Sequence, residues 1–191
     1  MGGPQIQNRG TLGGNIANAS PAGDTFPPLA VYEANVNVLS ASGQRSIPFL
    51  AVFAGVKKTT LKPGELIASV DIPLMKKKPT RTLFRKVGTR QAQAISKTAA
   101  AGLLWLEGGV VSELRFALGS VAPTVRRLKT MEEFVKGKKL TAETIEKAAS
   151  LVDIDISPID DIRSTRRYRL EVSKNILRRF LQENEKEKNR A

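Results

Sequence analysis

The chain has no cysteine and no histidine among its 191 residues. Without these residues it cannot supply a thiolate nucleophile, a serine–histidine pair, a zinc site or the ligands of an iron–sulphur cluster. We therefore expect no catalytic side chain and no metal site in this chain. Any redox chemistry must be carried by a bound cofactor.

Long apolar runs are absent as well. No run approaches the roughly 20 apolar residues that a membrane-spanning helix needs, and the first residues lack the basic-then-apolar pattern of a secretion signal. The lack of cysteine is compatible with a reducing compartment. We expect a soluble, cytoplasmic protein with no membrane contact.

Aromatic residues are scarce, at 5% of the chain, whereas Lys+Arg number 31 against 18 Asp+Glu, a formal net charge of +13. Such an excess attracts polyanions. However, few aromatic side chains are available to stack on bases, and acidic residues are interspersed among the basic ones. Nucleic acid is therefore not the expected partner, although a basic module that binds RNA or an acidic protein surface stays open as an alternative.

A hydrophobic fraction of 41% is sufficient for a hydrophobic core. The pattern of apolar, polar and turn-forming residues divides the chain into two structural halves. Residues 1–30 are rich in Gly, Pro, Asn and Ser without periodicity and predict loops. The rest of the first half predicts a hairpin over 34–41 and 45–48, a short helix over 49–56 and a strand over 65–72. A charged, proline-ended linker follows at Lys76–Pro79.

The second half predicts an antiparallel sheet followed by helices. Alternation and a Gly-Gly turn indicate strands over 82–88, 97–107 and 110–121, although the alanines at 99–101 locally favour helix. Hydroxyl and acidic residues at 130–133 and 141–144 are typical of helix starts, which predicts helices over 130–136 and 141–151. A 3.6-residue apolar period predicts the longest helix over 160–181. The fold class is therefore α+β.

The stretch of residues 11–24 carries the most chemical information. Adjacent Gly13 and Gly14 let backbone N–H groups converge on a ligand without interference from a Cβ. Hydroxyl, amide and carboxylate groups around them can fix pyrophosphate and sugar groups; they belong to Thr11, Asn15, Ser20 and Asp24. An ordinary Gly/Asn turn is the alternative that this short motif leaves open.

The whole segment, Thr-Leu-Gly-Gly-Asn-Ile-Ala-Asn-Ala-Ser-Pro-Ala-Gly-Asp, resembles the second flavin-binding segment of the molybdenum hydroxylases, the family of xanthine dehydrogenase, aldehyde oxidase and the aerobic carbon monoxide dehydrogenase flavoprotein. Five further segments follow in the family's order: residues 58–67, 84–90, 94–97, 118–124 and 161–169. The resemblance spans roughly residues 5 to 182.

This resemblance implies an FAD-binding (medium) subunit and assigns roles to individual residues. Thr11 and the amides around Gly13, Gly14 and Asn15 would hold the pyrophosphate, and Ser20 would add a hydroxyl. Asp24 would accept a hydrogen bond from the cofactor. Ile67 and Lys86 fall where the family has an apolar contact and a basic residue near the flavin, although alone they could be a core and a surface residue.

The implied organisation is the C-terminal part of a PCMH-type FAD-binding domain over residues 1–76, a CO dehydrogenase flavoprotein C-terminal-like domain over 80–182, and a frayed tail over 183–191. The family's earlier subdomain, with its own glycine-rich loop, has no counterpart here, which indicates a truncated product, an engineered fragment or half of a split subunit. We therefore expect FAD to find only a weak or incomplete site in this chain alone, and no independent activity.

The family's role would be to pass electrons from partner iron–sulphur clusters through FAD to NAD or another acceptor. The implied partners are a molybdenum-cofactor large subunit and an iron–sulphur small subunit. A vestigial structural fragment without flavin is a further alternative. Two basic clusters, residues 126–129 and 163–169, are expected to be solvated surface, or else to dock an acidic partner.

Overall fold

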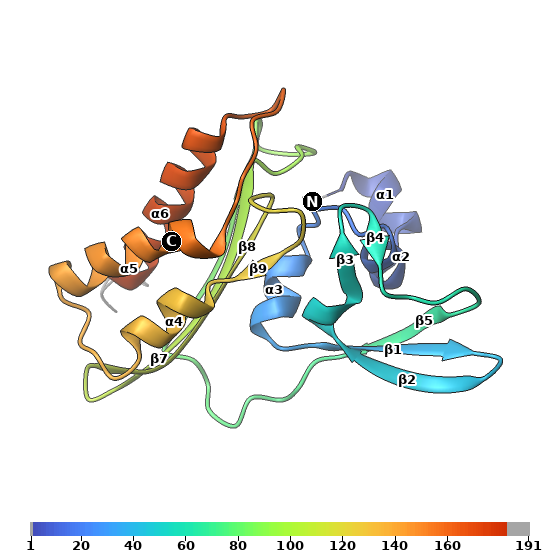
Figure 1. Cartoon of the computed structure of the whole chain (residues 1–191), viewed down its shortest axis with the longest axis horizontal. Helices are drawn as coiled ribbons and strands as arrows, with labels where there is room; N and C mark the ends of the chain where they lie inside the picture. The colour runs from blue at the N-terminus through green and yellow to red at the C-terminus, as the bar shows by residue number, and fades with distance from the viewer. Residues whose placement is uncertain (1, 183–191) are drawn as a thin grey trace.

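A four-stranded antiparallel sheet forms the centre of the molecule, and other elements cover both of its faces (Figure 1). The computed structural model describes residues 2–182, so the expected tail over 183–191 lies outside the described residues. The sheet has the order β6-β7-β8-β9. Its strands are β6 (Arg81–Val87), β7 (Thr98–Glu107), β8 (Val110–Gly119) and the short β9 (Arg126–Arg127).

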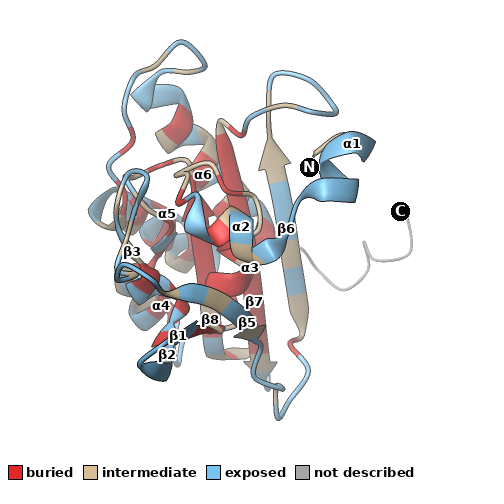
Figure 2. Cartoon of the chain, turned by 90° about the vertical axis from the view of Figure 1, so that its right-hand side faces the viewer, coloured by how far each residue is buried: buried red, intermediate tan, exposed pale blue. Residues whose placement is uncertain are grey.

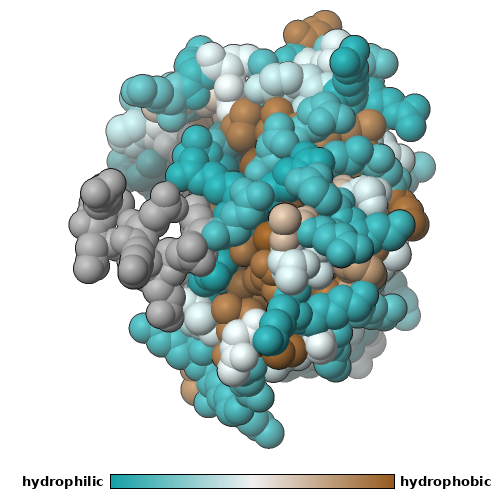
Figure 3. Space-filling view, turned by 90° about the vertical axis from the view of Figure 1, so that its left-hand side faces the viewer, coloured by the Kyte–Doolittle hydropathy of each residue, from teal (hydrophilic) through white to brown (hydrophobic). Residues whose placement is uncertain are grey.

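Three helices cover one face of this sheet: α4 (Lys129–Val135), α5 (Ala142–Asp155) and α6 (Arg166–Gln182). Thr141 caps α5 by accepting the N–H of Thr144, as its sequence predicts. Gly102 makes room for α6, because a Cβ there would lie 2.7 Å from the Phe180 ring. The outer side of this layer is largely hydrophilic, with smaller apolar areas between the polar side chains (Figure 3).

The opposite face of the sheet packs against the first half of the chain, and chiefly against α3 (Phe26–Val31). Ala101, Leu103 and Trp105 share one core with Phe26, while Ala100 and Leu104 face the helices. β7 is consequently buried along most of its length, whereas β6 is a partly exposed edge strand (Figure 2). Burial on both faces explains why an alanine-rich segment that locally favours helix forms a strand.

The first half contains a sheet of order β2-β1-β5, formed by β1 (Asn35–Ser40), β2 (Gly43–Pro48) and β5 (Leu66–Asp71). The predicted helix over 49–56 is wrong in its second part. A single 3-10 turn, η1 (Phe49–Val52), is followed by strand β3 (Phe53–Gly55), which pairs with β4 (Lys58–Thr59). Phe49 and Phe53 both pack on Phe26, and this aromatic cluster favours the extended chain at Phe53.

The expectation of loops over residues 1–30 is also wrong. Besides α3, this region forms α1 (Pro4–Arg9) and α2 (Leu12–Ala17). Each of the three helices has six residues, which is too short for a 3.6-residue apolar period to appear. The local signals that do mark them are Pro4 and Pro27 in first turns and the Thr11 cap.

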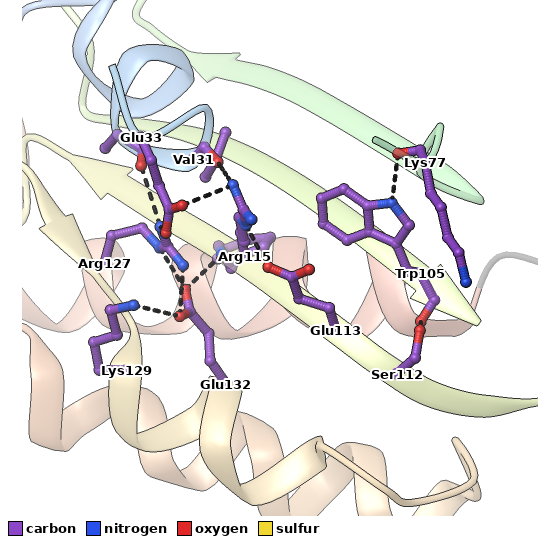
Figure 4. Close-up of polar contacts among 12 residues, drawn as sticks. Val31, Glu33, Lys77, Trp105, Ser112, Glu113, Arg115, Arg127, Lys129 and Glu132 are labelled. Carbon is purple, nitrogen blue, oxygen red and sulfur yellow. Dashed lines mark hydrogen bonds and ion pairs between the residues drawn. The ribbon is translucent and has the colours of Figure 1, made fainter. Parts of the chain in front are cut away.

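A buried polar network ties the two halves together (Figure 4). Arg127 and Glu132 form a bidentate ion pair with Nε–Oε1 and Nη2–Oε2 distances of 2.7 and 2.8 Å. Arg127 also donates to the carbonyl of Ala30 at the end of α3 and contacts Glu33. The expectation that cluster 126–129 is solvated is therefore wrong at Arg127, which is 8% exposed.

The segment between β5 and β6 contains the predicted linker and forms no helix or strand. Trp105 of β7 donates its indole N–H to the carbonyl of Lys77, which fixes this segment beside β7 (Figure 4). Within residues 2–182, no helix is long and apolar enough to cross a membrane.

Candidate functional site

The glycine segment begins with a capped helix. The Oγ1 of Thr11 accepts the backbone N–H of Gly14 at 2.9 Å, which fixes the first turn of α2. First-turn N–H groups of a helix have no intrahelical acceptor, and those of Leu12 and Gly13 lie in this turn. Thr11 and Gly14 are exposed. The backbone around Gly13 can therefore face an anionic group of a ligand.

The two glycines of this turn lie close to different neighbours, Gly13 to β5 and Gly14 to the Thr11 cap. A Cβ on Gly13 would lie 3.4 Å from Cγ2 of Ile67, and a Cβ on Gly14 would lie 2.9 Å from the capping oxygen of Thr11. The structure thus brings the expected apolar contact, Ile67, directly against the expected pyrophosphate turn.

Asn15 connects this turn to the loop that follows it. Its Oδ1 accepts a hydrogen bond of 2.6 Å from Oγ1 of Thr25. Thr25 directly follows Asp24, so this bond sets the position of the carboxylate relative to α2. Asn15 therefore acts here through its side chain on the protein itself.

The carboxylate of Asp24 is held from two sides. Its Oδ2 accepts from Nζ of Lys86 on β6 and its Oδ1 accepts from Oγ of Ser96, both at 2.5 Å. The Asp24 and Lys86 side chains keep 13% and 20% exposure, while Ser96 is buried. The sequence analysis named Asp24 and Lys86 separately, and the fold joins them in one ion pair.

Ser96 is the residue that sequence reasoning missed. It lies in the segment Ala94–Lys97, which was noted only as part of the family resemblance. A serine between an apolar residue and a lysine carries no signal of its own. Its role becomes visible only when the loop before β7 is placed beside Asp24.

A cavity of about 390 Å³ opens beside this ion pair. Its lining includes Ser20, Asp24, Lys86 and Ile95, together with Gly2, Gly3, Ile6, Ala22, Gln93 and Ala94. The candidate residues thus form two groups. Ser20, Asp24 and Lys86 border the cavity, whereas Thr11, Gly13, Gly14, Asn15 and Ile67 surround the start of α2 and do not line it.

The two groups suit different parts of an elongated ligand. The open glycine turn offers N–H groups to a pyrophosphate, and the cavity offers an ammonium, a carboxylate and apolar walls to a ring system. The hydrogen bond from Thr25 to Asn15 links the groups. FAD has this combination of a pyrophosphate and a ring, so the residues present fit it.

The second basic cluster is not simply a solvated surface. Arg169 is 3% exposed and pairs with Asp161 at 2.9 Å, so the expectation for residues 163–169 is wrong at Arg169. Burial opposes ionisation of Asp161, but N–H groups of Arg163 and Ser164 and the Arg169 guanidinium together hold its pKa below the ordinary value.

Two family models match the chain. One is the FAD binding domain in molybdopterin dehydrogenase, over residues 1–75, and the other is the CO dehydrogenase flavoprotein C-terminal domain, over residues 83–184. Among characterised relatives, the glyceraldehyde dehydrogenase medium chain of Sulfolobus acidocaldarius is 34% identical over 174 residues, and the xanthine dehydrogenase FAD-binding subunit of Escherichia coli O157:H7 is 30% identical over 183.

These relatives are longer than the chain. The matches cover 91% and 96% of the chain but 61% and 63% of the two relatives. A solved structure of carbon monoxide dehydrogenase from Hydrogenophaga pseudoflava superimposes with a TM-score of 0.88 at 28% identity, covering 95% of this chain and 62% of that one. The chain therefore belongs to the family of FAD-binding medium subunits of the molybdenum hydroxylases, whose cofactor is FAD.

Proposed function

We propose that the chain is the FAD-binding subunit of a molybdenum hydroxylase complex. In this role it takes electrons from iron–sulphur clusters of a small subunit and passes them to NAD or another acceptor. Substrate oxidation would belong to a molybdenum-cofactor large subunit. The chain has no cysteine or histidine for clusters of its own, which supports a relay that depends on partners. The proposed location is the cytoplasm.

The observation that carries this proposal is the joined cluster of Lys86, Asp24 and Ser96, of which Lys86 and Asp24 line the cavity of about 390 Å³. When bound, FAD supplies a ring that accepts and releases electrons. Lys86 would place a positive charge beside that ring and so favour its negatively charged form. Asp24 would fix the Lys86 ammonium and offer an acceptor to the ligand, while Ser96 holds the carboxylate in place.

The glycine turn would bind the other part of the cofactor. The N–H groups around Gly13 would donate to the pyrophosphate, with Thr11 keeping the turn in shape, and Ile67 would support the turn from beneath. We propose that the part of the relatives' length that this chain does not span supplies the remaining contacts; the matches cover 61% and 63% of the two relatives. FAD should then bind weakly to this chain alone and more tightly when that part is added.

The test is a titration with FAD followed by flavin fluorescence, with and without the separately expressed N-terminal part of the Sulfolobus acidocaldarius relative. We expect saturable binding that tightens with the added part and weakens in Lys86→Met. Lys174→Met is the matched control, because Lys174 also forms an ion pair, with Asp153 at 2.7 Å, but on the helical face. It should leave FAD binding unchanged.

Two results would contradict the proposal. Absence of flavin binding under both conditions would indicate a structural fragment. RNA binding with a steep salt dependence, in place of flavin binding, would indicate a basic module.

A further inference from the structure

A second cavity, of about 530 Å³, adjoins the first, and the two cavities share the lining residues Ser20, Ala22 and Ile95. This volume is within the range of about 300–1,000 Å³ that is typical of small-molecule sites. Its other lining residues are Pro21, Val56, Ser96, Ser120, Ala122, Pro123, Ser157, Ile159, Asp161, Arg163 and Arg169. Most of these residues have no role in the proposed flavin site.

The cavity gathers segments that are far apart in sequence. Residues 20–22, 95–96, 120–123 and 161–169 each contribute, and all four ranges fall in segments that carry the family resemblance. The last two have no part in the flavin contacts. Their convergence on one cavity gives them a common candidate role.

The base of the cavity is rigid and polar. The guanidinium of Arg169 donates to the carbonyls of Lys97 and Ser120 at 2.6 and 2.8 Å and to Oδ1 of Asp161 at 2.9 Å. Asp161 in turn accepts the backbone N–H groups of Arg163 and Ser164. A site held in this way is organised before a ligand arrives, which lowers the entropic cost of binding.

Hydrogen-bonding capacity remains unused at this base. Among residues 2–182, Nε of Arg169 and Oγ of Ser120 are buried without a hydrogen-bond partner, and so is Oγ1 of Thr98 at the start of β7. Thr98 precedes Ala99, which pairs with Gly119 next to Ser120, so all three atoms lie at one end of β7 and β8. Of these three residues only Ser120 and Arg169 line the cavity, and their unpaired atoms are buried, so a ligand is selected by the apolar walls and by the exposed groups at the rim.

Charge narrows the class of ligand. The cavity holds two guanidinium groups and one carboxylate, a balance of one positive charge. Arg163 stands at the rim with 40% of its side chain exposed, and it meets Asp161 only at 3.4 Å. Most other walls are apolar, including Pro21, Ala122 and Pro123. We propose that this cavity binds a small monocarboxylate with an apolar body, which lies between the apolar walls while its carboxylate pairs with Arg163.

Ser96 connects this ligand to the neighbouring site. It lines the second cavity, and its hydroxyl holds Asp24, which lines the first. A ligand seated here would therefore lie beside the residue that holds Asp24 in its pair with Lys86. Binding of the ligand should therefore shift the amide signal of Ser96 as well as that of Arg163 at the rim.

The test uses 1-naphthoate as the probe and 1-naphthalenemethanol as its uncharged counterpart. Titrations of the ¹⁵N-labelled chain are followed by amide chemical shifts and calorimetry. We expect saturable naphthoate binding, with shifts at Ala22, Ser96, Ser120 and Arg163, that Arg163→Gln weakens about ten-fold through loss of a charge-assisted hydrogen bond. Binding of the alcohol should not change in this variant.

Arg167→Gln is the matched control, because Arg167 is an exposed arginine of the same segment that does not line the cavity. It should bind naphthoate as the parent does. Filling the cavity with Ala122→Trp should abolish binding of both probes. Equal loss in Arg163→Gln and Arg167→Gln, shifts confined to other surfaces, or no saturable binding of naphthoate would overturn the proposal.

Discussion

Arg127 offers the sharpest test of the buried polar network, because it pairs with Glu132 within the second half and reaches Ala30 and Glu33 of the first half. Arg127→Met removes the cation but keeps most of the side-chain volume. Both side chains are almost fully buried, at 4% and 7% exposure, so Glu132 would be left as a buried charge without its main partner. Its carboxylate would retain the N–H of Phe116 and a distant contact of 3.6 Å to Lys129.

The expected cost follows from this burial. Breaking a buried ion pair by removing one partner costs about 3–5 kcal/mol, whereas an exposed pair contributes about 0–1 kcal/mol. We therefore expect Arg127→Met to lower the free energy of unfolding by about 3–5 kcal/mol. At about 2–4 °C per kcal/mol for a chain of this size, the melting temperature should fall by roughly 6–20 °C.

Urea denaturation followed by circular dichroism measures this free energy, with Arg126→Met as the control. Arg126 is the exposed neighbour of Arg127 on β9, and its replacement should cost less than about 0.5 kcal/mol. A loss below about 1 kcal/mol in Arg127→Met, or equal losses in the two variants, would refute the argument from burial.

Three further predictions concern other parts of the chain. The hydrogen bonds from Arg45 lower the pKa of Glu65 to about 2. The stability that this pair contributes is therefore present above the unfolded pKa of Glu65 and is lost as the pH falls from about 4.5 to about 2. In Glu65→Gln the free energy of unfolding should depend less on pH in that range. Gly102→Ala should cost about 1–3 kcal/mol in urea denaturation, because its Cβ would overlap the ring of Phe180. Lys86→Met should weaken FAD binding in fluorescence titrations about ten-fold or more, because the positive charge beside the ring is lost. The variant should still fold as the parent does.

The elements that the sequence predicts best are those with strong periodicity. β7, β8 and α5 begin within a residue of the expected positions, because alternation, a Gly-Gly turn and a capping threonine are all local signals. The longest helix begins later than expected, at Arg166 in place of 160, since residues 160–164 form a turn around the Asp161 carboxylate. That turn depends on Arg169 and could not be foreseen from apolar spacing.

The candidate site was predictable only in its parts. The glycine turn carries its own signal, and the family resemblance adds Asp24 and Lys86. Their pairing, however, depends on placing β6 beside the loop that follows α2, which are 62 residues apart in sequence. Ser96 could not be predicted for the same reason, because a hydroxyl that orients a distant carboxylate leaves no pattern in the local sequence.

The central sheet brings the binding groups of both cavities to one end of its strands. Its two faces are occupied by packing, with α4–α6 on one side and α3 on the other, so no ligand can reach the middle of β7 or β8. The binding groups come from the strand ends and the segments next to them: Lys86 near the end of β6, Ser96 before β7 and Ser120 after β8. Because one buried sheet places all three, a change that tilts β7 should disturb both cavities together, whereas a substitution confined to Arg163 should disturb only the second.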